Sequence, residues 1–174
     1  PISSVMGYGS LLADGTGGPL TPDQERFLDA MLRNVNRMEL LVSDLQDISR
    51  IEAGNISLEL VNASVEHVLK GAAQTLGSQI ERHEQTIELN IPEELPKVKA
   101  DPVRLSQVVN NLLSNATKYT PDGGHIALVA HKRDGYVECS VSDTGIGIGP
   151  EDQERIFDKF YRAHNPTVDH VPGT

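Results

Sequence analysis

The sequence contains little cysteine and few aromatic residues. Cys139 is the single cysteine among 174 residues, Trp is absent, and aromatic residues make up 4% of the chain. One thiol excludes an internal disulfide framework, and Cys139 has no Cys or His partners at zinc-binding spacing. Hydrophobic residues nevertheless make up 38%. We therefore predict a largely aliphatic core, with Cys139 as a small core residue on a strand.

Positive charge and long apolar runs are also scarce. The chain has 15 Lys and Arg against 25 Asp and Glu, a formal net charge of −10. Nucleic-acid binding needs clustered basic residues, so we expect no nucleic-acid partner. Neither a membrane-spanning run nor a signal peptide is present. We expect a cytoplasmic segment without direct membrane contact, which is compatible with membrane anchoring of a longer parent protein.

The pattern of residues 1–54 predicts a helical hairpin. Apolar residues recur at helical spacing over residues 1–13, and a glycine-rich break follows. Residues 21–24 supply an N-cap Thr, a first-position Pro and a capping-box Gln. A second helix is expected over residues 22–53, with Gly54 as its C-terminal stop. Its apolar seam consists of Leu28, Leu32, Val35, Met38, Val42, Leu45 and Ile48.

The seam is longer than the first helix, which cannot cover all of it. Either the domain that follows covers the rest, or a second copy of the chain does. A heptad-like stripe sustained along one long helix favours a bundle between chains. We therefore expect a homodimer formed through the helical hairpin.

From Asn55 onward the spacing of apolar residues alternates between strand and helix periods. An Asp134-Gly135 turn joins two strands into a hairpin, with Val137, Cys139 and Val141 on the inward face of the second strand. Helices on one face of a mixed sheet make an α+β fold, an α/β sandwich. The expected strands span residues 56–60, 85–91, 97–100, 125–133 and 136–142, and the expected helices span residues 64–82 and 101–120.

The helix from Asp101 to Thr120 has an apolar face and a polar face. Asp101 is a suitable N-cap, and Pro102 suits the first helical position. Asn111, Asn115 and Lys118 lie three or four residues apart, so they project on one side. Amide oxygens can hold a hydrated divalent cation and the ammonium can reach a polyphosphate, although an ordinary amphipathic helix is the alternative. The face expected to be buried consists of Val103, Leu105, Val108, Val109, Leu112, Leu113 and Ala116.

A glycine-rich loop follows the last expected strand. It reads Asp143-Thr144-Gly145-Ile146-Gly147. Glycines let the backbone approach a flat ligand closely, and a carboxylate accepts a hydrogen bond from an exocyclic amine. A Gly-x-Gly loop alone is more often a tight turn than a nucleotide site. The order of the asparagine helix and this loop is the stronger indication.

Taken together, these segments resemble the sensor histidine kinases. Asn111–Tyr119 is similar to the N box of that family, Asp143–Gly147 to its G1 box, and Ile156–Arg162 to its F box. Pro172–Thr174 resembles the start of a G2 box. The family belongs to the ATPase superfamily of gyrase B, Hsp90 and the mismatch-repair ATPases.

The resemblance implies two domains. Residues 1–54 would be the dimerisation and histidine-phosphotransfer domain, a dimeric four-helix bundle, without its start. Residues 55–174 would be the catalytic ATP-binding domain of the histidine kinase type, without its C-terminal part. We therefore expect the sequence to be trimmed at both ends.

The resemblance also assigns roles on the central helix. It implies ATP and Mg²⁺ as cofactors, with Asn115 as the principal Mg²⁺ ligand and Asn111 contacting metal or phosphate. Lys118 would meet phosphate oxygens, and Tyr119 would line the nucleotide pocket.

Further roles fall on the loop and the segment after it. The resemblance implies that Asp143 recognises the adenine amine and that Gly145 and Gly147 give the backbone room. Phe157 and Phe160 would anchor a mobile lid, and plain core aromatics are the alternative.

The implied reaction transfers the ATP γ-phosphoryl group to a histidine and then to an aspartate of a response-regulator receiver domain. In the family, the acceptor histidine lies on the first helix of the bundle. It is not in this sequence, so we expect this segment to bind nucleotide without phosphorylating itself. A non-catalytic dimeric module with a degenerate ATP-binding domain, and another ATPase of the superfamily, are the alternatives. None of the histidines fits the acceptor position: His67, His83, His125, His131, His164 and His170.

Overall fold

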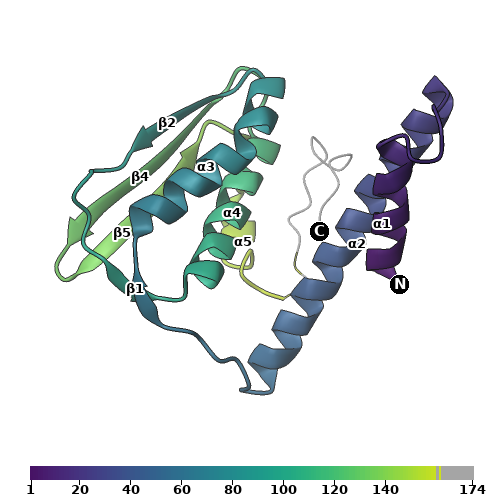
Figure 1. Cartoon of the computed structure of the whole chain (residues 1–174). Helices are drawn as coiled ribbons and strands as arrows, with labels where there is room; N and C mark the ends of the chain where they lie inside the picture. Colours follow the sequence, from purple (N-terminus) through teal and green to yellow (C-terminus); the bar gives the residue numbers. More distant parts are fainter. Residues whose placement is uncertain (160, 162–174) are drawn as a thin grey trace. The chain divides into compact units, whose positions relative to one another are not determined.

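The computed structural model describes residues 1–159 and residue 161. The chain divides into two compact units, one formed by residues 1–57 and the other beginning at Leu58 (Figure 1). The first is a helical hairpin and the second is a mixed α/β sheet domain, which confirms the predicted fold class.

The hairpin consists of α1 (Ile2–Ala13) and α2 (Pro22–Glu52). The predicted capping box at the start of α2 is confirmed, because the Gln24 N–H donates to Thr21 Oγ1 and the Thr21 N–H donates to Gln24 Oε1 at 2.8 Å. Gly54 ends the helix at φ +67°, as predicted.

The apolar seam of α2 divides between a buried part and an exposed part. Leu28 and Val35 are each 8% exposed. Gly9 of α1 lies so close to Leu32 that a Cβ at Gly9 would stand 2.5 Å from Leu32 Cδ2. The short α1 therefore covers the N-terminal part of the seam. The exposed large apolar side chains of α2 are Phe27, Met31, Met38, Leu40, Leu41, Val42, Leu45 and Ile51.

The second unit contains a mixed three-stranded sheet in the order β2-β4-β5. Strand β2 (Thr86–Asn90) pairs in parallel with β4 (His125–Arg133), and β4 pairs antiparallel with β5 (Tyr136–Asp143). The β4–β5 hairpin turns at Asp134-Gly135 as predicted, with both residues at positive φ. A separate antiparallel pair joins β1 (Val61–Ala63) to β3 (Val98–Ala100).

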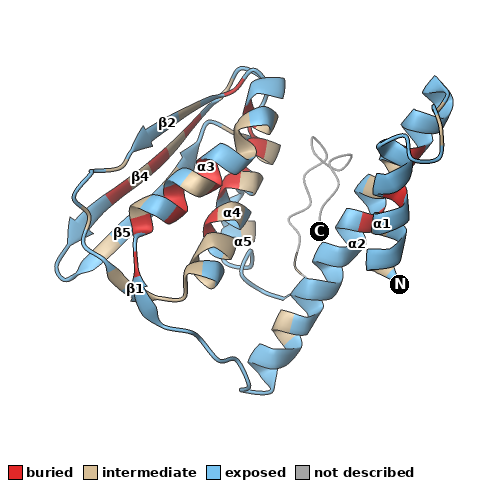
Figure 2. Ribbon diagram, in the orientation of Figure 1, coloured by how far each residue is buried: buried red, intermediate tan, exposed pale blue. Residues whose placement is uncertain are grey.

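Helices α3 (Val65–Arg82) and α4 (Pro102–Tyr119) pack together on one face of the three-stranded sheet (Figure 1). Figure 2 shows buried segments on both helices and on β4, and these buried residues form one cluster. A short helix, α5 (Pro150–Gln153), follows the glycine-rich loop. The core consists of Val65, Val68, Leu69, Ala72, Val109, Leu113, Ala116, Ile126, Leu128 and Ala130.

The predicted strand over residues 56–60 is wrong. Ile56, Leu58 and Leu60 are all exposed, and pairing begins at Val61. The Glu59 N–H donates instead to Asp101 Oδ2 at 3.1 Å, so this segment is tied to the start of α4 rather than to a strand. Alternation of apolar and polar residues here does not reflect a half-buried sheet position.

Two burial predictions also need correction. Val103, Val108 and Leu112 of α4 are exposed, because the sheet and α3 contact a narrower arc of the helix, centred on Val109, Leu113 and Ala116. Cys139 is exposed rather than a core residue. It pairs with buried Ala130, but it lies on β5 at the edge of the described sheet.

Within the described part of the chain, no helix is both long enough and apolar enough to cross a membrane.

Candidate functional site

The start of α4 is fixed by the side chain of Asp101. Its Oδ1 accepts hydrogen bonds from the N–H groups of Val103 at 3.0 Å and Arg104 at 3.2 Å. Its Oδ2 accepts from the N–H of Glu59. These backbone donors, that of Arg104 first, hold the pKa of the Asp101 carboxyl below its ordinary value. The polar row farther along α4 therefore starts from a well-anchored end.

The polar row lies on the side of α4 away from the core. Asn111 and Asn115 are exposed, and neither carboxamide has a hydrogen-bond partner within residues 1–159. Lys118 is half-buried, and its Nζ lies 4.8 Å from the centre of the Tyr119 ring. The row thus presents free amide oxygens and an ammonium without a carboxylate partner among the described residues.

The glycine-rich loop meets the end of α4 through its backbone. The Ile146 N–H donates to the Tyr119 carbonyl oxygen at 3.2 Å. A Cβ at Gly145 would stand 2.6 Å from that same oxygen, closer than real Cβ contacts allow. Glycine at 145 is therefore required by a close approach, whereas Gly147 is favoured by its φ of +70°.

Asp143 is held by its own loop. Its Oδ1 accepts a hydrogen bond from the Gly145 N–H at 2.8 Å, an Asx-type turn. The residue is exposed, and its Oδ2 has no partner among the described residues. One oxygen thus orients the carboxylate, and the other remains able to accept a hydrogen bond from a ligand.

The structure therefore brings four predicted residues together: Lys118, Tyr119, Asp143 and Gly145. Asn111 and Asn115 lie on the preceding turns of the same helix, and no hydrogen bond among the described residues joins them to the loop. Phe157 is 90% exposed, so it is not a core aromatic here. Phe160 lies outside the described residues.

Sequence reasoning missed a pair that ties the loop to the sheet. Thr144 Oγ1 accepts a hydrogen bond from the His125 N–H at 3.0 Å, and the Thr144 N–H donates to the His125 carbonyl oxygen at 3.0 Å. These bonds extend the β4–β5 ladder by one residue into the loop. It also missed Gln85, whose side chain bonds the end of α4. Thr144 belongs to the glycine-rich motif, but its partner His125 and Gln85 belong to no motif, so composition and spacing gave no signal for these contacts.

The residues present fit a magnesium nucleotide. Carboxamide oxygens are suitable ligands for a hard cation, and an ammonium suits phosphate oxygens. The Gly145 cradle and the free Asp143 oxygen suit a planar base with an exocyclic amine. Among the described residues, no group of three His, Cys, Asp or Glu side chains offers an alternative metal site.

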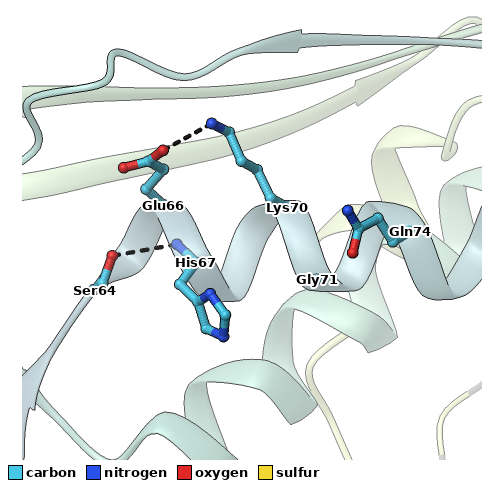
Figure 3. A pocket seen from close by; sticks show the side chains of 6 residues that line it. All are labelled: Ser64, Glu66, His67, Lys70, Gly71 and Gln74. Atoms are coloured by element: carbon cyan, nitrogen blue, oxygen red, sulfur yellow. Dashed lines mark hydrogen bonds and ion pairs between the residues drawn. The ribbon is translucent and has the colours of Figure 1, made fainter.

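A hollow on α3 lies apart from the polar row in the sequence. It is lined by Ser64, Glu66, His67, Lys70, Gly71 and Gln74 (Figure 3). Lys70 Nζ lies 2.7 Å from Glu66 Oε1, so the main cation and anion of the hollow neutralise each other. The hollow therefore lacks the free charge that distinguishes the end of α4.

Two families match the sequence. Residues 100–173 match the histidine kinase-, DNA gyrase B- and HSP90-like ATPases, and residues 1–54 match the His Kinase A phospho-acceptor domain. The adaptive-response sensory kinase SasA of Synechococcus sp. (strain CC9902) is 41% identical over 140 residues, which is 78% of this chain and 35% of SasA. The histidine protein kinase DivJ of Caulobacter vibrioides is 32% identical over 163 residues, 94% of this chain and 27% of DivJ.

Solved structures are similar as well. Full-length ShkA in complex with AMPPNP has a TM-score of 0.71 and 29% identity, covering 87% of this chain and 32% of ShkA. ThkA in complex with the response regulator protein TrrA shares the fold, with a TM-score of 0.65 and 20% identity over 92% of this chain and 47% of that one.

The fold and the site define an ATPase domain of the histidine kinase, gyrase and HSP90 type, preceded by a helical phospho-acceptor domain. The chain belongs to the sensor histidine kinases. It spans about a third of SasA and about a quarter of DivJ.

Proposed function

We propose that the chain is the core of an ATP-dependent protein-histidine kinase and that it binds Mg²⁺-ATP at the end of α4. The contact that carries this proposal is the one between the Tyr119 carbonyl oxygen and the Ile146 N–H. It joins the helix bearing the asparagine row to the loop bearing Asp143. Family membership supports the proposal, and so does the AMPPNP complex of ShkA, a similar structure.

Each residue of the polar row has a proposed task. Asn115 is the principal Mg²⁺ ligand, and Asn111 contacts the metal or a phosphate. Lys118 meets phosphate oxygens, and its position over the Tyr119 ring keeps the ammonium near the loop. Among the described residues neither carboxamide has a hydrogen-bond partner and Lys118 has no carboxylate partner, so all three groups are available to a ligand, which supports the assignment.

The loop residues take the nucleotide base. Asp143 accepts the adenine amine with Oδ2, while the Gly145 N–H fixes Oδ1. Tyr119 lines the pocket, and Gly145 and Gly147 keep the backbone close to it. Phe157 anchors a lid over the nucleotide together with Phe160, and the exposure of Phe157 leaves it available for that contact.

Bound ATP supplies the γ-phosphoryl group for transfer. The residues of this chain bind, orient and neutralise, which is most of what phosphoryl transfer asks of a protein. The six histidines all lie at position 67 or later, so residues 1–54 do not include the acceptor histidine. A response-regulator receiver domain is the proposed final acceptor, as the ThkA–TrrA complex suggests for that relative.

The helical hairpin is proposed to dimerise. Met31, Met38, Val42 and Leu45 form part of an apolar stripe on α2 that is exposed in the single chain. A second copy that covers this stripe would complete a four-helix bundle. The match of residues 1–54 to a phospho-acceptor domain supports this arrangement.

Calorimetric titration with AMPPNP, with and without Mg²⁺, tests the nucleotide site. We expect Mg²⁺-dependent binding by the natural chain and a loss of at least about tenfold in Asn115→Ala, the size of one lost charge-assisted contact. Asn90→Ala is the matched control, because Asn90 is exposed at the end of β2. If the folded natural chain does not bind, the non-catalytic interaction module replaces the kinase core as the better proposal.

A further inference from the structure

Gln85 is a buried polar residue that reaches the end of α4. It is 6% exposed and stands immediately before β2. Its Nε2 donates to the carbonyl oxygens of Thr117 at 3.0 Å and Thr120 at 2.6 Å, and the Pro121 carbonyl oxygen lies at 3.5 Å. An amide nitrogen carries two hydrogens, so the two shorter contacts are the bonds it makes.

The end of α4 needs this donor. The last carbonyls of a helix have no intrahelical partner. The Thr117 carbonyl would ordinarily receive the N–H of residue 121, but residue 121 is proline and has none. Gln85 therefore donates where the backbone cannot. Its Oε1 has no partner within the described residues, so the bonds that hold this side chain are those donated by Nε2.

The backbone of Gln85 is itself held on both sides. Its N–H donates to the Ile80 carbonyl oxygen at 3.0 Å, closing the end of α3. The next residue, Thr86, donates its N–H to the Gly124 carbonyl oxygen at 2.9 Å. The backbone that carries the side chain is thus fixed between α3 and the sheet, so the amide holds the end of α4 at a fixed position relative to both.

We propose that Gln85 is a positioning residue for the nucleotide site, an inference that rests on the proposed function of that site. The turn it holds carries Lys118 and Tyr119. The Tyr119 carbonyl oxygen in turn holds Ile146 and packs against Gly145. Loss of these hydrogen bonds therefore displaces the phosphate-binding ammonium and loosens the base-binding loop, although the side chain of Gln85 bonds only to the end of α4 among the described residues.

Gln85→Leu and Gln85→Met test this inference, because both side chains fill the site and neither has a hydrogen-bond donor. Gln74→Leu is the matched control, since Gln74 is exposed on α3. We expect the Ile146 amide to exchange its hydrogen about tenfold faster and AMPPNP to bind about tenfold more weakly, the size of one lost buried hydrogen bond. The exchange rate and the affinity are both measured under conditions in which urea titration shows that every variant is folded.

Unchanged Ile146 exchange and unchanged affinity in both variants would overturn the inference. If a variant fails to fold, the natural chain supplies the test: the Gln85 side-chain amide resonances should shift when AMPPNP binds, and their failure to shift would also overturn it. The outcomes separate from those of the proposed function. A natural chain that binds no nucleotide contradicts the nucleotide site. Faster Ile146 exchange in Gln85→Leu would still show that Gln85 positions the end of α4 and the loop.

Discussion

At the scale of single residues, two glycines in one loop meet different physical demands. Gly145 is needed because a Cβ would strike the Tyr119 carbonyl oxygen and Asp143 Oδ1, each at 2.6 Å. Gly147 has open space around it and a φ of +70°. Gly145 is therefore required by close packing, and Gly147 is favoured by its backbone conformation.

Gly145→Ala should therefore damage the site more than Gly147→Ala. For Gly145→Ala we expect a loss of about 1–3 kcal/mol in unfolding free energy from overpacking, with at least tenfold weaker AMPPNP binding. For Gly147→Ala we expect a loss of about 1 kcal/mol in unfolding free energy from backbone strain. Urea unfolding and calorimetry measure both quantities. Equal losses of affinity in the two variants would contradict the close approach of the loop to α4.

Asp101 gives the domain an acid-sensitive cap. Its pKa is lowered in the folded chain from an ordinary value of 3.8, chiefly by the Arg104 N–H. The stability it contributes is therefore present above that ordinary value and is lost as pH falls through the lower folded value. Asp101→Asn keeps a capping oxygen but cannot titrate. Its urea midpoint should fall less than that of the natural chain between about pH 5 and pH 2.5. If the midpoints of the two proteins fall equally over this range, the titration of Asp101 does not contribute to acid sensitivity.

At the scale of elements, three helices end with the same hydrogen-bond pattern but not with the same residue. Helices α1 and α2 end at Gly15 and Gly54, with φ of +78° and +67°. Helix α3 has Glu84 there, at φ +52°. A Cβ is disfavoured in this left-handed region, so α3 ends under strain that the other two avoid.

Glu84→Gly should therefore stabilise the sheet domain. We expect a gain of roughly 0.5–1 kcal/mol, since glycine relieves the left-handed strain but loses more entropy on folding. Glu84→Ala removes the same charged side chain and keeps the Cβ, so it is the matched control and should give no such gain. Urea unfolding of the three proteins makes the comparison. A gain shared by both variants would assign the effect to charge rather than to the backbone.

Local signals predicted the elements better than the pairing. The caps at Thr21 and Asp101 and the turn at Asp134-Gly135 involve neighbouring residues, and all three are confirmed. The strand over 56–60 failed because alternation does not determine whether a partner strand lies alongside. The role of Gln85 could not be predicted from local sequence, because its hydrogen-bond partners lie 32 or more residues away. The motif residues were found by resemblance, whereas their contact with one another came from the fold.

At the scale of the whole molecule, the exposed stripe on α2 should determine the oligomeric state. Met38 and Leu45 are 54% and 57% exposed in the single chain. A charge at either position would be buried in a bundle without a partner. The double variant Met38→Glu with Leu45→Glu should therefore weaken self-association at least about a hundredfold, since about 1.5–3 kcal/mol is lost per buried apolar side chain.

Leu40→Glu is the control for the stripe. Leu40 is equally exposed, at 57%, but lies on another face of α2 by helical spacing. Sedimentation equilibrium should find it as dimeric as the natural chain. A monomeric natural chain, or equal disruption by both proteins, would contradict dimerisation through the stripe.

The central claim is that α4 and the loop of residues 143–147 form one nucleotide site. The most direct test is a titration of the ¹⁵N-labelled chain with AMPPNP and Mg²⁺, followed by amide resonances. We predict the largest shifts in the Asn111 and Asn115 side-chain amides and in the backbone amides of residues 143–147. Largest shifts in residues 64–74, around the hollow on α3, would place the nucleotide elsewhere and contradict the claim.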